Sequence, residues 1–218
     1  MSQLFGENDC EINAFWPHGR IDEEPLYLRE NMALTPTTSI ALGFDAPAFE
    51  LPDAISGQQL NADDLFDGGP TVVIFMCNHC PFVIHLLDEL VSLAEAYQAR
   101  GVNFIGISSN DVESYPQDSF RNMKALADSY NMPFPYLYDE SQDVARAYDA
   151  ACTPDFSVFD VQRKCVYRGQ FDDSRPGNKG PITGNDLREA LDLLLAGSRV
   201  PGDGQVPSIG CNIKWKAS

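Results

Sequence analysis

The chain has 218 residues, of which 44% are hydrophobic and 22% are charged, a composition typical of one soluble domain with some additional segments. Its 32 acidic and 15 basic side chains give a formal net charge of -17, which repels the phosphates of nucleic acids and anionic membrane surfaces. We therefore expect neither nucleic acid nor a membrane as a partner.

Cysteine usage and the N-terminal composition indicate a compartment. The first 31 residues contain seven acids and no continuous apolar stretch, so a secretory signal is not expected. No stretch of the sequence has the apolar length of a transmembrane helix. The six cysteines are irregularly spaced, unlike the framework of a small secreted scaffold. These features predict a cytoplasmic protein with reduced thiols.

Composition and periodicity divide the chain into three segments. Residues 1–40 mix Gly, Pro and acids without periodicity, which predicts an acidic, partly disordered N-terminal extension. Residues 41–198 alternate between strand and helix patterns and should form one domain. Residues 199–218 are rich in Gly and Pro, and we expect this C-terminal tail to pack on the domain.

The predicted domain begins with a hairpin, Phe49–Leu51 with Gln58–Leu60, and a short helix capped by Asn61. The apolar run 71–76 predicts a buried strand, and apolar residues at three- and four-residue spacing predict a helix from about residue 82. The later predicted elements are strand 102–108, a helix around 120–130, an apolar segment 134–138, helix 143–148, strands 155–159 and 165–170, and helix 185–196. Such alternation with a late hairpin predicts a mixed sheet covered on both faces.

Cys77-Asn78-His79-Cys80-Pro81 lies where the strand 71–76 gives way to this first long helix. Two cysteines separated by two residues at such a junction predict dithiol chemistry. Unpaired N–H groups and the positive end of the helix dipole stabilise a thiolate there. We therefore expect the pKa of Cys77 to fall below the free value of about 8.5. Pro81 suits the first helical turn, where a proline loses little hydrogen bonding.

This motif, together with the Thr153-Pro154 pair that opens the later hairpin, resembles the thioredoxin-like superfamily. More narrowly, residues 76–83, 106–111, 152–155 and 210–215 resemble a bacterial subgroup of its redoxin, or AhpC/TSA, branch. The resemblance covers about residues 40–218. It implies an α/β thioredoxin-like fold with a mixed central sheet flanked by helices on both faces, to which the N-terminal β-hairpin is added.

The resemblance also implies roles within the motif. Cys77, on the solvent side of the turn, is the expected attacking thiolate and forms a mixed disulfide with the substrate. Cys80, one helical turn inside, then closes the Cys77–Cys80 disulfide and expels the product. The imidazole of His79 is expected to stabilise the thiolate and thereby favour the reduced form.

Pro154 resembles the superfamily's cis-proline, which holds the backbone of the preceding residue beside the cysteines. There the Thr153 backbone would pair with an extended substrate segment. The predicted catalytic residues are Cys77, Cys80, His79 and Pro154, and the predicted substrate-binding residues are Thr153, Asn78 and Pro81.

The resulting hypothesis is a thiol-disulfide oxidoreductase without a cofactor, acting on a protein or small-molecule disulfide. The resemblance implies a reducing partner such as a thioredoxin reductase system or glutathione.

Peroxidase activity is the first alternative. In peroxiredoxins a threonine stands three residues before the peroxide-attacking cysteine, which is followed by proline. Cys80-Pro81 matches the second feature, but Cys77 occupies the threonine position and Val73 stands where a proline is expected. Peroxide reduction through a sulfenic acid at either sulfur is still chemically open.

Other readings of the cysteines are a non-enzymatic redox sensor, a purely structural pair and a metal site. A zinc site needs about four ligands, and the chain has three histidines and no second Cys-x-x-Cys, so no metal is expected. Cys152 and Cys211 are candidates for accessory redox roles, with burial as a small hydrophobic residue as the alternative for each.

Overall fold

The computed structural model describes residues 34–38, 41–178 and 180–217, which all belong to one unit, Ala33–Ser218. The predicted N-terminal extension therefore lies outside the described residues, apart from its last part. Leu34–Pro36 of that part form strand β1, a strand that the sequence did not predict. Of the helices described, none is both long and apolar enough to cross a membrane.

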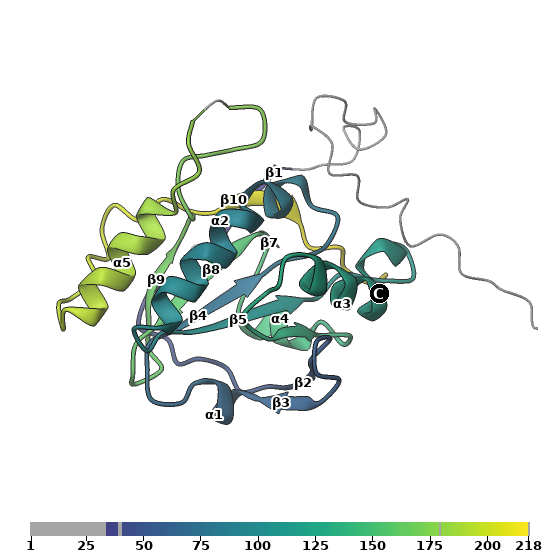
Figure 1. Ribbon diagram of the computed structural model, residues 1–218, viewed down its shortest axis with the longest axis horizontal. Coiled ribbons are helices and arrows are strands. Elements are labelled where there is room, and N and C mark those ends of the chain that lie inside the picture. The colour runs from purple at the N-terminus through teal and green to yellow at the C-terminus, as the bar shows by residue number, and fades with distance from the viewer. Residues whose placement is uncertain (1–33, 39–40, 179, 218) are drawn as a thin grey trace, which may run out of the picture. The chain divides into compact units, whose positions relative to one another are not determined.

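A five-stranded sheet forms the centre of the unit (Figure 1). Its order is β6-β5-β4-β8-β9, formed by Tyr136–Tyr138, Asn103–Ser108, Thr71–Phe75, Asp155–Phe159 and Cys165–Gly169. β4, β5 and β6 are parallel, whereas β8 and β9 are antiparallel to their neighbours. Every residue of β4 is buried, as expected for a strand covered on both faces. The mixed sheet predicted from the sequence is confirmed.

The predicted hairpin and the helices are also confirmed. The hairpin consists of β2 (Glu50–Pro52) and β3 (Gln59–Asn61), and the Asn61 side chain accepts a hydrogen bond from the Asp64 N–H to cap the first helix. The helices are α1 (Ala62–Leu65), α2 (Pro81–Gln98), α3 (Phe120–Ser129), α4 (Asp143–Ala147) and α5 (Asn185–Leu195). A 3-10 turn at Pro116–Asp118 was not predicted.

Helix α2 covers one face of the sheet and carries the cysteine motif at its N-terminus. Its buried side chains share one face of the helix and are Val83, Leu86, Leu87, Leu90, Leu93, Ala94 and Tyr97. Arg188 of α5 pairs with Glu89 of α2 at 2.6 Å, which places these two helices side by side. Packing along the whole of α2 thus holds the N-terminus of this helix in place.

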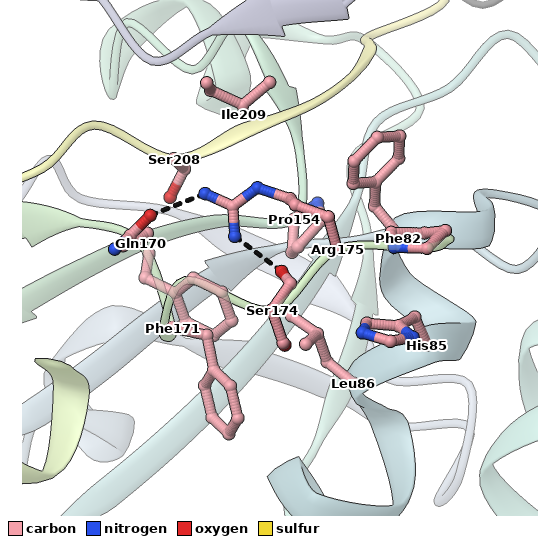
Figure 2. Close-up of a pocket in the computed structure, with 12 residues that line it drawn as sticks. Phe82, His85, Leu86, Pro154, Gln170, Phe171, Ser174, Arg175, Ser208 and Ile209 are labelled. Atoms are coloured by element: carbon pink, nitrogen blue, oxygen red, sulfur yellow. Dashed lines mark hydrogen bonds between the residues drawn. The ribbon is translucent and has the colours of Figure 1, made fainter. Parts of the chain in front are cut away.

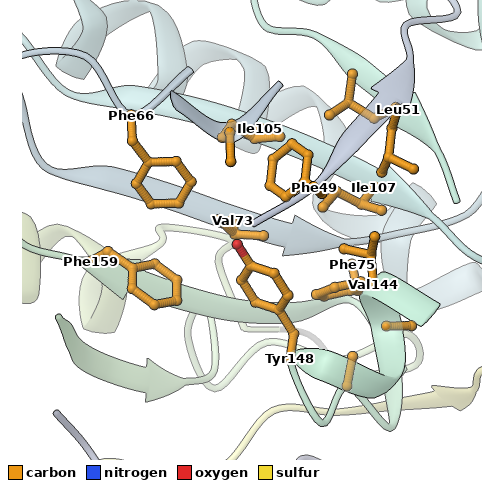
Figure 3. Packing of buried hydrophobic residues seen from close by; sticks show 14 of the residues in the cluster. Phe49, Leu51, Phe66, Val73, Phe75, Ile105, Ile107, Val144, Tyr148 and Phe159 are labelled. Atoms are coloured by element: carbon orange, nitrogen blue, oxygen red, sulfur yellow. The ribbon is translucent and has the colours of Figure 1, made fainter. Parts of the chain in front are cut away.

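The opposite face of the sheet packs against the hairpin, α1 and α4 (Figure 3). Phe159 lies within this cluster, fully buried, with its ring edge-to-face against Phe44 and Phe66 at 5.6 Å and Tyr148 at 5.9 Å between centroids. Aromatic pairs in this arrangement stabilise a core beyond their buried area.

A second, three-stranded sheet joins the C-terminal tail to the domain. Its order is β1-β10-β7, in which β10 is Ile209–Asn212 and β7 is Cys152–Thr153. A side chain at Gly210 would place its Cβ 2.0 Å from the Thr153 carbonyl oxygen, so only glycine allows β10 to approach this closely. The strands have two to four residues each, too few to show an alternating pattern, and the sequence predicted none of them.

We predict that Phe159→Ala lowers the free energy of unfolding by about 3–5 kcal/mol, because it leaves a cavity among three aromatic rings. Val161→Ala is the matched control, since Val161 is 60% exposed in the following turn and should change stability by less than about 0.5 kcal/mol. Urea denaturation measures both variants. Equal midpoints would show that the cluster around Phe159 does not support the fold.

Candidate active site

The cysteine motif forms the turn between β4 and α2, as predicted. Cys80 is the N-cap of α2 with extended backbone, and its carbonyl accepts hydrogen bonds from the N–H groups of Val83 and Ile84, each at 3.0 Å. Pro81 occupies the first helical turn, where no donor is lost. Both cysteines are free thiols, and Cys77 and Cys80 are 1% and 0% exposed. The expectation that Cys77 faces solvent is therefore wrong.

The Thr153–Pro154 bond is cis, as the sequence predicted, and Thr153 lies against both cysteines. Its hydroxyl is 3.4 Å from the Cys77 sulfur, and its carbonyl oxygen is 3.1 Å from the Cys80 sulfur. The fold thus brings Cys77 and Cys80 next to Thr153 and Pro154. The two pairs are far apart in the sequence but were assigned to one site.

Asp118 is a central residue of the site that the sequence did not reveal. It ends the 3-10 turn, and its carboxylate is fully buried. One carboxylate oxygen accepts from the backbone N–H groups of Asn78 at 2.8 Å and His79 at 3.3 Å. The other lies 2.7 Å from His79 Nδ1 and accepts from the Asn110 amide at 2.8 Å. A lone Asp in a loop carries no sequence signal for such a role.

Burial, together with Cys80 and Asp118, shifts the pKa of Cys77 opposite to the expected direction. Burial raises the pKa of the Cys77 thiol well above its ordinary value, and a hydrogen bond to Cys80 and the negative charge of Asp118 raise it further. The backbone N–H groups of Asn78 and His79, which could have stabilised a thiolate at this turn, are bonded to Asp118 instead. The prediction of a lowered pKa for Cys77 is therefore wrong.

The pKa of Cys80 shifts in the opposite direction. Burial opposes its ionisation, but hydrogen bonds with the Cys211 thiol, the Cys77 thiol, the Thr153 hydroxyl and the Cys211 backbone outweigh burial and hold the pKa of Cys80 well below its ordinary value. The sulfur atoms of Cys80 and Cys211 are 3.0 Å apart. Cys211 in turn stays protonated, because donation to Cys80 and burial raise its pKa. The Thr153 carbonyl oxygen, 3.1 Å from the Cys80 sulfur, accepts a hydrogen bond when Cys80 is protonated.

The two remaining motif side chains have structural partners. The Asn78 amide donates to the Gln117 carbonyl at 2.9 Å, and its oxygen accepts from the Tyr136 hydroxyl at 3.0 Å, so this buried side chain already has partners. The amide satisfies buried polar groups inside the fold, and a substrate-binding role of Asn78 stays a prediction. His79 bonds to Asp118 and stacks on Tyr115 with centroids 5.6 Å apart. Its side chain is 16% exposed.

Cys77, His79 and Asp118 bring three ligand atoms within 4.8 Å of one another. His79 Nδ1 and the Asp118 oxygen are 2.7 Å apart, a hydrogen-bond distance, so these two atoms are already paired. The arrangement supplies fewer protein ligands than the four of a structural zinc site.

Cys152 is buried next to the cis-proline, Pro154. Its sulfur is 3.8 Å from the Thr37 hydroxyl and 3.7 Å from the Pro154 carbonyl oxygen, and burial raises the pKa of its thiol. These contacts are those of a buried, protonated cysteine.

A shallow depression lies beside Pro154 and the first turns of α2 (Figure 2). Phe82, Leu86, Phe171 and Ile209 give it an apolar lining. Arg175 lines another part of it, where its guanidinium donates to the Gln170 side chain at 2.5 Å and the Ser174 carbonyl at 2.6 Å. An apolar surface with one fixed cation next to the reactive sulfurs can hold part of a small substrate.

Removal of the Asp118 charge should lower the pKa of Cys77. We predict that Asp118→Asn shifts the pH midpoint of Cys77 alkylation by iodoacetamide, followed by mass spectrometry, down by about 1 pH unit. Asp128→Asn removes an exposed charge at the end of α3 and should leave the midpoint unchanged. A midpoint that stays constant or rises in Asp118→Asn would exclude this electrostatic effect.

Asp155 should make stability depend on pH. It is 2% exposed, accepts from the Thr37 hydroxyl at 2.8 Å, and lies 3.7 Å from Arg168. Burial nevertheless raises the pKa of Asp155 from 3.8 to about 6. Because the folded pKa is the higher one, the stabilisation from this proton is present below about pH 4 and is lost as the pH rises through about 6.

We therefore predict that the wild-type protein loses on the order of 3 kcal/mol relative to Asp155→Asn between about pH 4 and pH 7. Urea denaturation at a series of pH values measures this difference, and Asp128→Asn again serves as the control. Parallel profiles for wild type and Asp155→Asn would show that Asp155 titrates normally.

Two solved structures resemble the whole described unit. A protein of Geobacillus kaustophilus is 54% identical, with a TM-score of 0.84 over 86% of this chain and 99% of that chain. A protein of Sinorhizobium meliloti 1021 is 46% identical, with a TM-score of 0.82 over 84% of this chain and 100% of that chain.

A third structure, the thioredoxin domain of a thiol-disulfide oxidoreductase from Bacteroides vulgatus, is 20% identical, with a TM-score of 0.53 over 70% of this chain and 99% of that chain. It supports the thioredoxin-like fold alone. No curated protein matches the chain. The profile of the AhpC/TSA family matches residues 42–170, more than half of the sequence. The chain therefore belongs to the AhpC/TSA family, the redoxin branch of the thioredoxin-like proteins.

Proposed function

We propose that the protein is a thiol-disulfide oxidoreductase that cycles between a Cys77–Cys80 dithiol and a Cys77–Cys80 disulfide. The observation that carries this proposal is that both thiols lie against Thr153 beside the cis-proline and have opposite pKa shifts. The sulfur with the lowered pKa would ionise first and attack, while the other would keep its proton until the second step. Family membership supports thiol redox chemistry in general.

The charge distribution favours Cys80 as the attacking sulfur, the reverse of the roles expected from the sequence. The Cys80 thiolate would attack one sulfur of the substrate disulfide, form a mixed disulfide and expel the first thiolate. Cys77 would then transfer its proton to that leaving group and attack the Cys80 sulfur. This step closes the Cys77–Cys80 bond and expels the second thiolate, so the substrate gains two electrons and the cysteines lose two.

Burial of both sulfurs favours small disulfides as substrates. Neither sulfur is more than 1% exposed, and the backbone edge at Thr153, where an extended polypeptide was expected to pair, is already paired with β10. A protein disulfide, the other substrate class expected from the sequence, would have to displace β10. A small disulfide would not need to pair with this backbone edge.

Peroxide reduction is a second candidate, favoured by the charge on Cys80. This cysteine precedes Pro81, which is the position of the attacking cysteine in peroxiredoxins, and a peroxide is smaller than a disulfide. The thiolate would take one oxygen from the peroxide to become a sulfenic acid, releasing an alkoxide that is protonated. Cys77 would then attack the Cys80 sulfur, and the disulfide would form with loss of water.

Stopped-flow kinetics with bis(2-hydroxyethyl) disulfide and with hydrogen peroxide test both candidates. We predict that the reduced protein reacts faster with the disulfide and that Cys80→Ser slows this reaction by more than about 100-fold, because the attacking sulfur is lost. Cys165→Ala is the matched control, since Cys165 is buried in β9 and contacts the Tyr167 carbonyl.

Each other outcome would contradict a different part of the proposal. Faster reaction with peroxide would make peroxidase the main activity. Loss of the first step in Cys77→Ser but not in Cys80→Ser would restore Cys77 as the attacking residue. Unchanged rates in both variants would refute the proposed function.

A further inference from the structure

We propose that Cys211 is a third redox-active residue, which exchanges with the Cys77–Cys80 disulfide to form a Cys80–Cys211 disulfide and releases Cys77 as a thiol. This inference rests on the proposed function, because the substrate must first oxidise Cys80, to the Cys77–Cys80 disulfide in the wild type or to a mixed disulfide with the substrate where Cys77 is replaced. It assigns a chemical role to the C-terminal tail.

The contact between the two sulfurs is the first observation. Cys80 and Cys211 lie 3.0 Å apart, about 1 Å longer than a disulfide bond of about 2.05 Å. Both side chains are buried, so no solvent separates them. Only a small displacement is needed to bring the sulfurs to bonding distance.

The second observation is that β10 holds Cys211 in this place from both sides. Cys211 is opposite Leu34 of β1 and opposite Thr153 of β7. Gly210 permits the close approach to the Thr153 carbonyl described above. Cys211 is thus fixed within a sheet rather than carried on a free end.

The residues after β10 are also tied to the domain. The Ile213 N–H donates to the Ala151 carbonyl at 3.1 Å, and the Lys214 N–H donates to the Asn110 side chain at 2.8 Å. Asn110 in turn bonds to Asp118, which connects the tail with the network around the cysteine motif. The tail is therefore held at the site by contacts on each side of Cys211.

The position of β10 is that of a substrate strand. The Thr153 backbone was expected to pair with an extended substrate next to the cysteines, and in the structure its partner is Cys211 of the same chain. A cysteine presented on this strand, with its sulfur on Cys80, has the placement of an internal substrate.

The other buried cysteines lack this placement. Cys152 contacts the Thr37 hydroxyl and the Pro154 carbonyl, and Cys165 contacts the Tyr167 carbonyl. The sulfur contact with Cys80 thus singles out Cys211.

The exchange needs no external oxidant or reductant. The Cys211 thiol gives up its proton as its sulfur attacks the Cys80 sulfur, the Cys80–Cys211 bond forms and the Cys77–Cys80 bond breaks. Cys77 leaves as a thiolate and takes up the proton that Cys211 lost. The number of disulfides is unchanged, and the oxidised protein keeps a free thiol at Cys77 instead of Cys211.

Peptide mapping of the full chain tests the exchange. The reduced protein is oxidised with bis(2-hydroxyethyl) disulfide, free thiols are blocked with N-ethylmaleimide, and the protein is digested with trypsin without reduction. Cys77 and Cys80 share the fragment 30–100, whereas Cys211 lies in the fragment 200–214. A Cys80–Cys211 bond joins these two fragments, and mass spectrometry detects the joined mass with N-ethylmaleimide on Cys77.

We expect the joined fragments in the oxidised wild-type protein and, as the main oxidised form, in Cys77→Ser. Cys152→Ser is the matched control and should retain the joined fragments, whereas Cys211→Ser should lose them and still form the Cys77–Cys80 disulfide.

Absence of the joined fragments from either wild type or Cys77→Ser overturns the role of Cys211. If wild type then still contains the Cys77–Cys80 disulfide and turns over substrate, the proposed function stands without it. If wild type forms neither disulfide, both proposals fail.

Discussion

The buried carboxylate of Asp118 is the constraint on which the chemistry of this site depends. By accepting hydrogen bonds from the Asn78 and His79 backbones, it takes the N–H groups that the turn would otherwise offer to a thiolate at Cys77. Its charge opposes a second negative charge at Cys77. The pKa of Cys80 is lowered instead, by hydrogen bonds with three side chains. The order of the two chemical steps follows from this asymmetry.

The C-terminal tail is part of the site rather than an addition to it. β10 supplies one donor to Cys80, covers the backbone edge of Thr153, and contributes Ile209 to the depression beside Pro154. These contacts restrict access to the sulfurs and favour compact substrates. Two residues of the tail have clear structural roles: Gly210 permits the close approach, and Cys211 provides the sulfur.

The sequence predicted the central sheet, the helices and the cysteine pair because these features depend on local patterns. β4 is a continuous apolar run, α2 has an apolar stripe, and Cys77 to Pro81 lie at a strand-to-helix junction. The electrostatics of the pair could not be predicted, because Asp118 is about 40 residues away and reaches the motif only through the fold. The short strands β1, β7 and β10 were missed for the same reason, since tertiary pairing and not periodicity defines them.

The location of the charge is the central claim, and NMR can test it directly. The reduced protein, labelled with ¹³C at the cysteine Cβ atoms, is titrated with pH and the shifts of Cys77, Cys80 and Cys211 are followed separately. The account predicts that Cys80 is ionised at neutral pH while Cys77 and Cys211 remain protonated. Ionisation of Cys77 before Cys80 would contradict it.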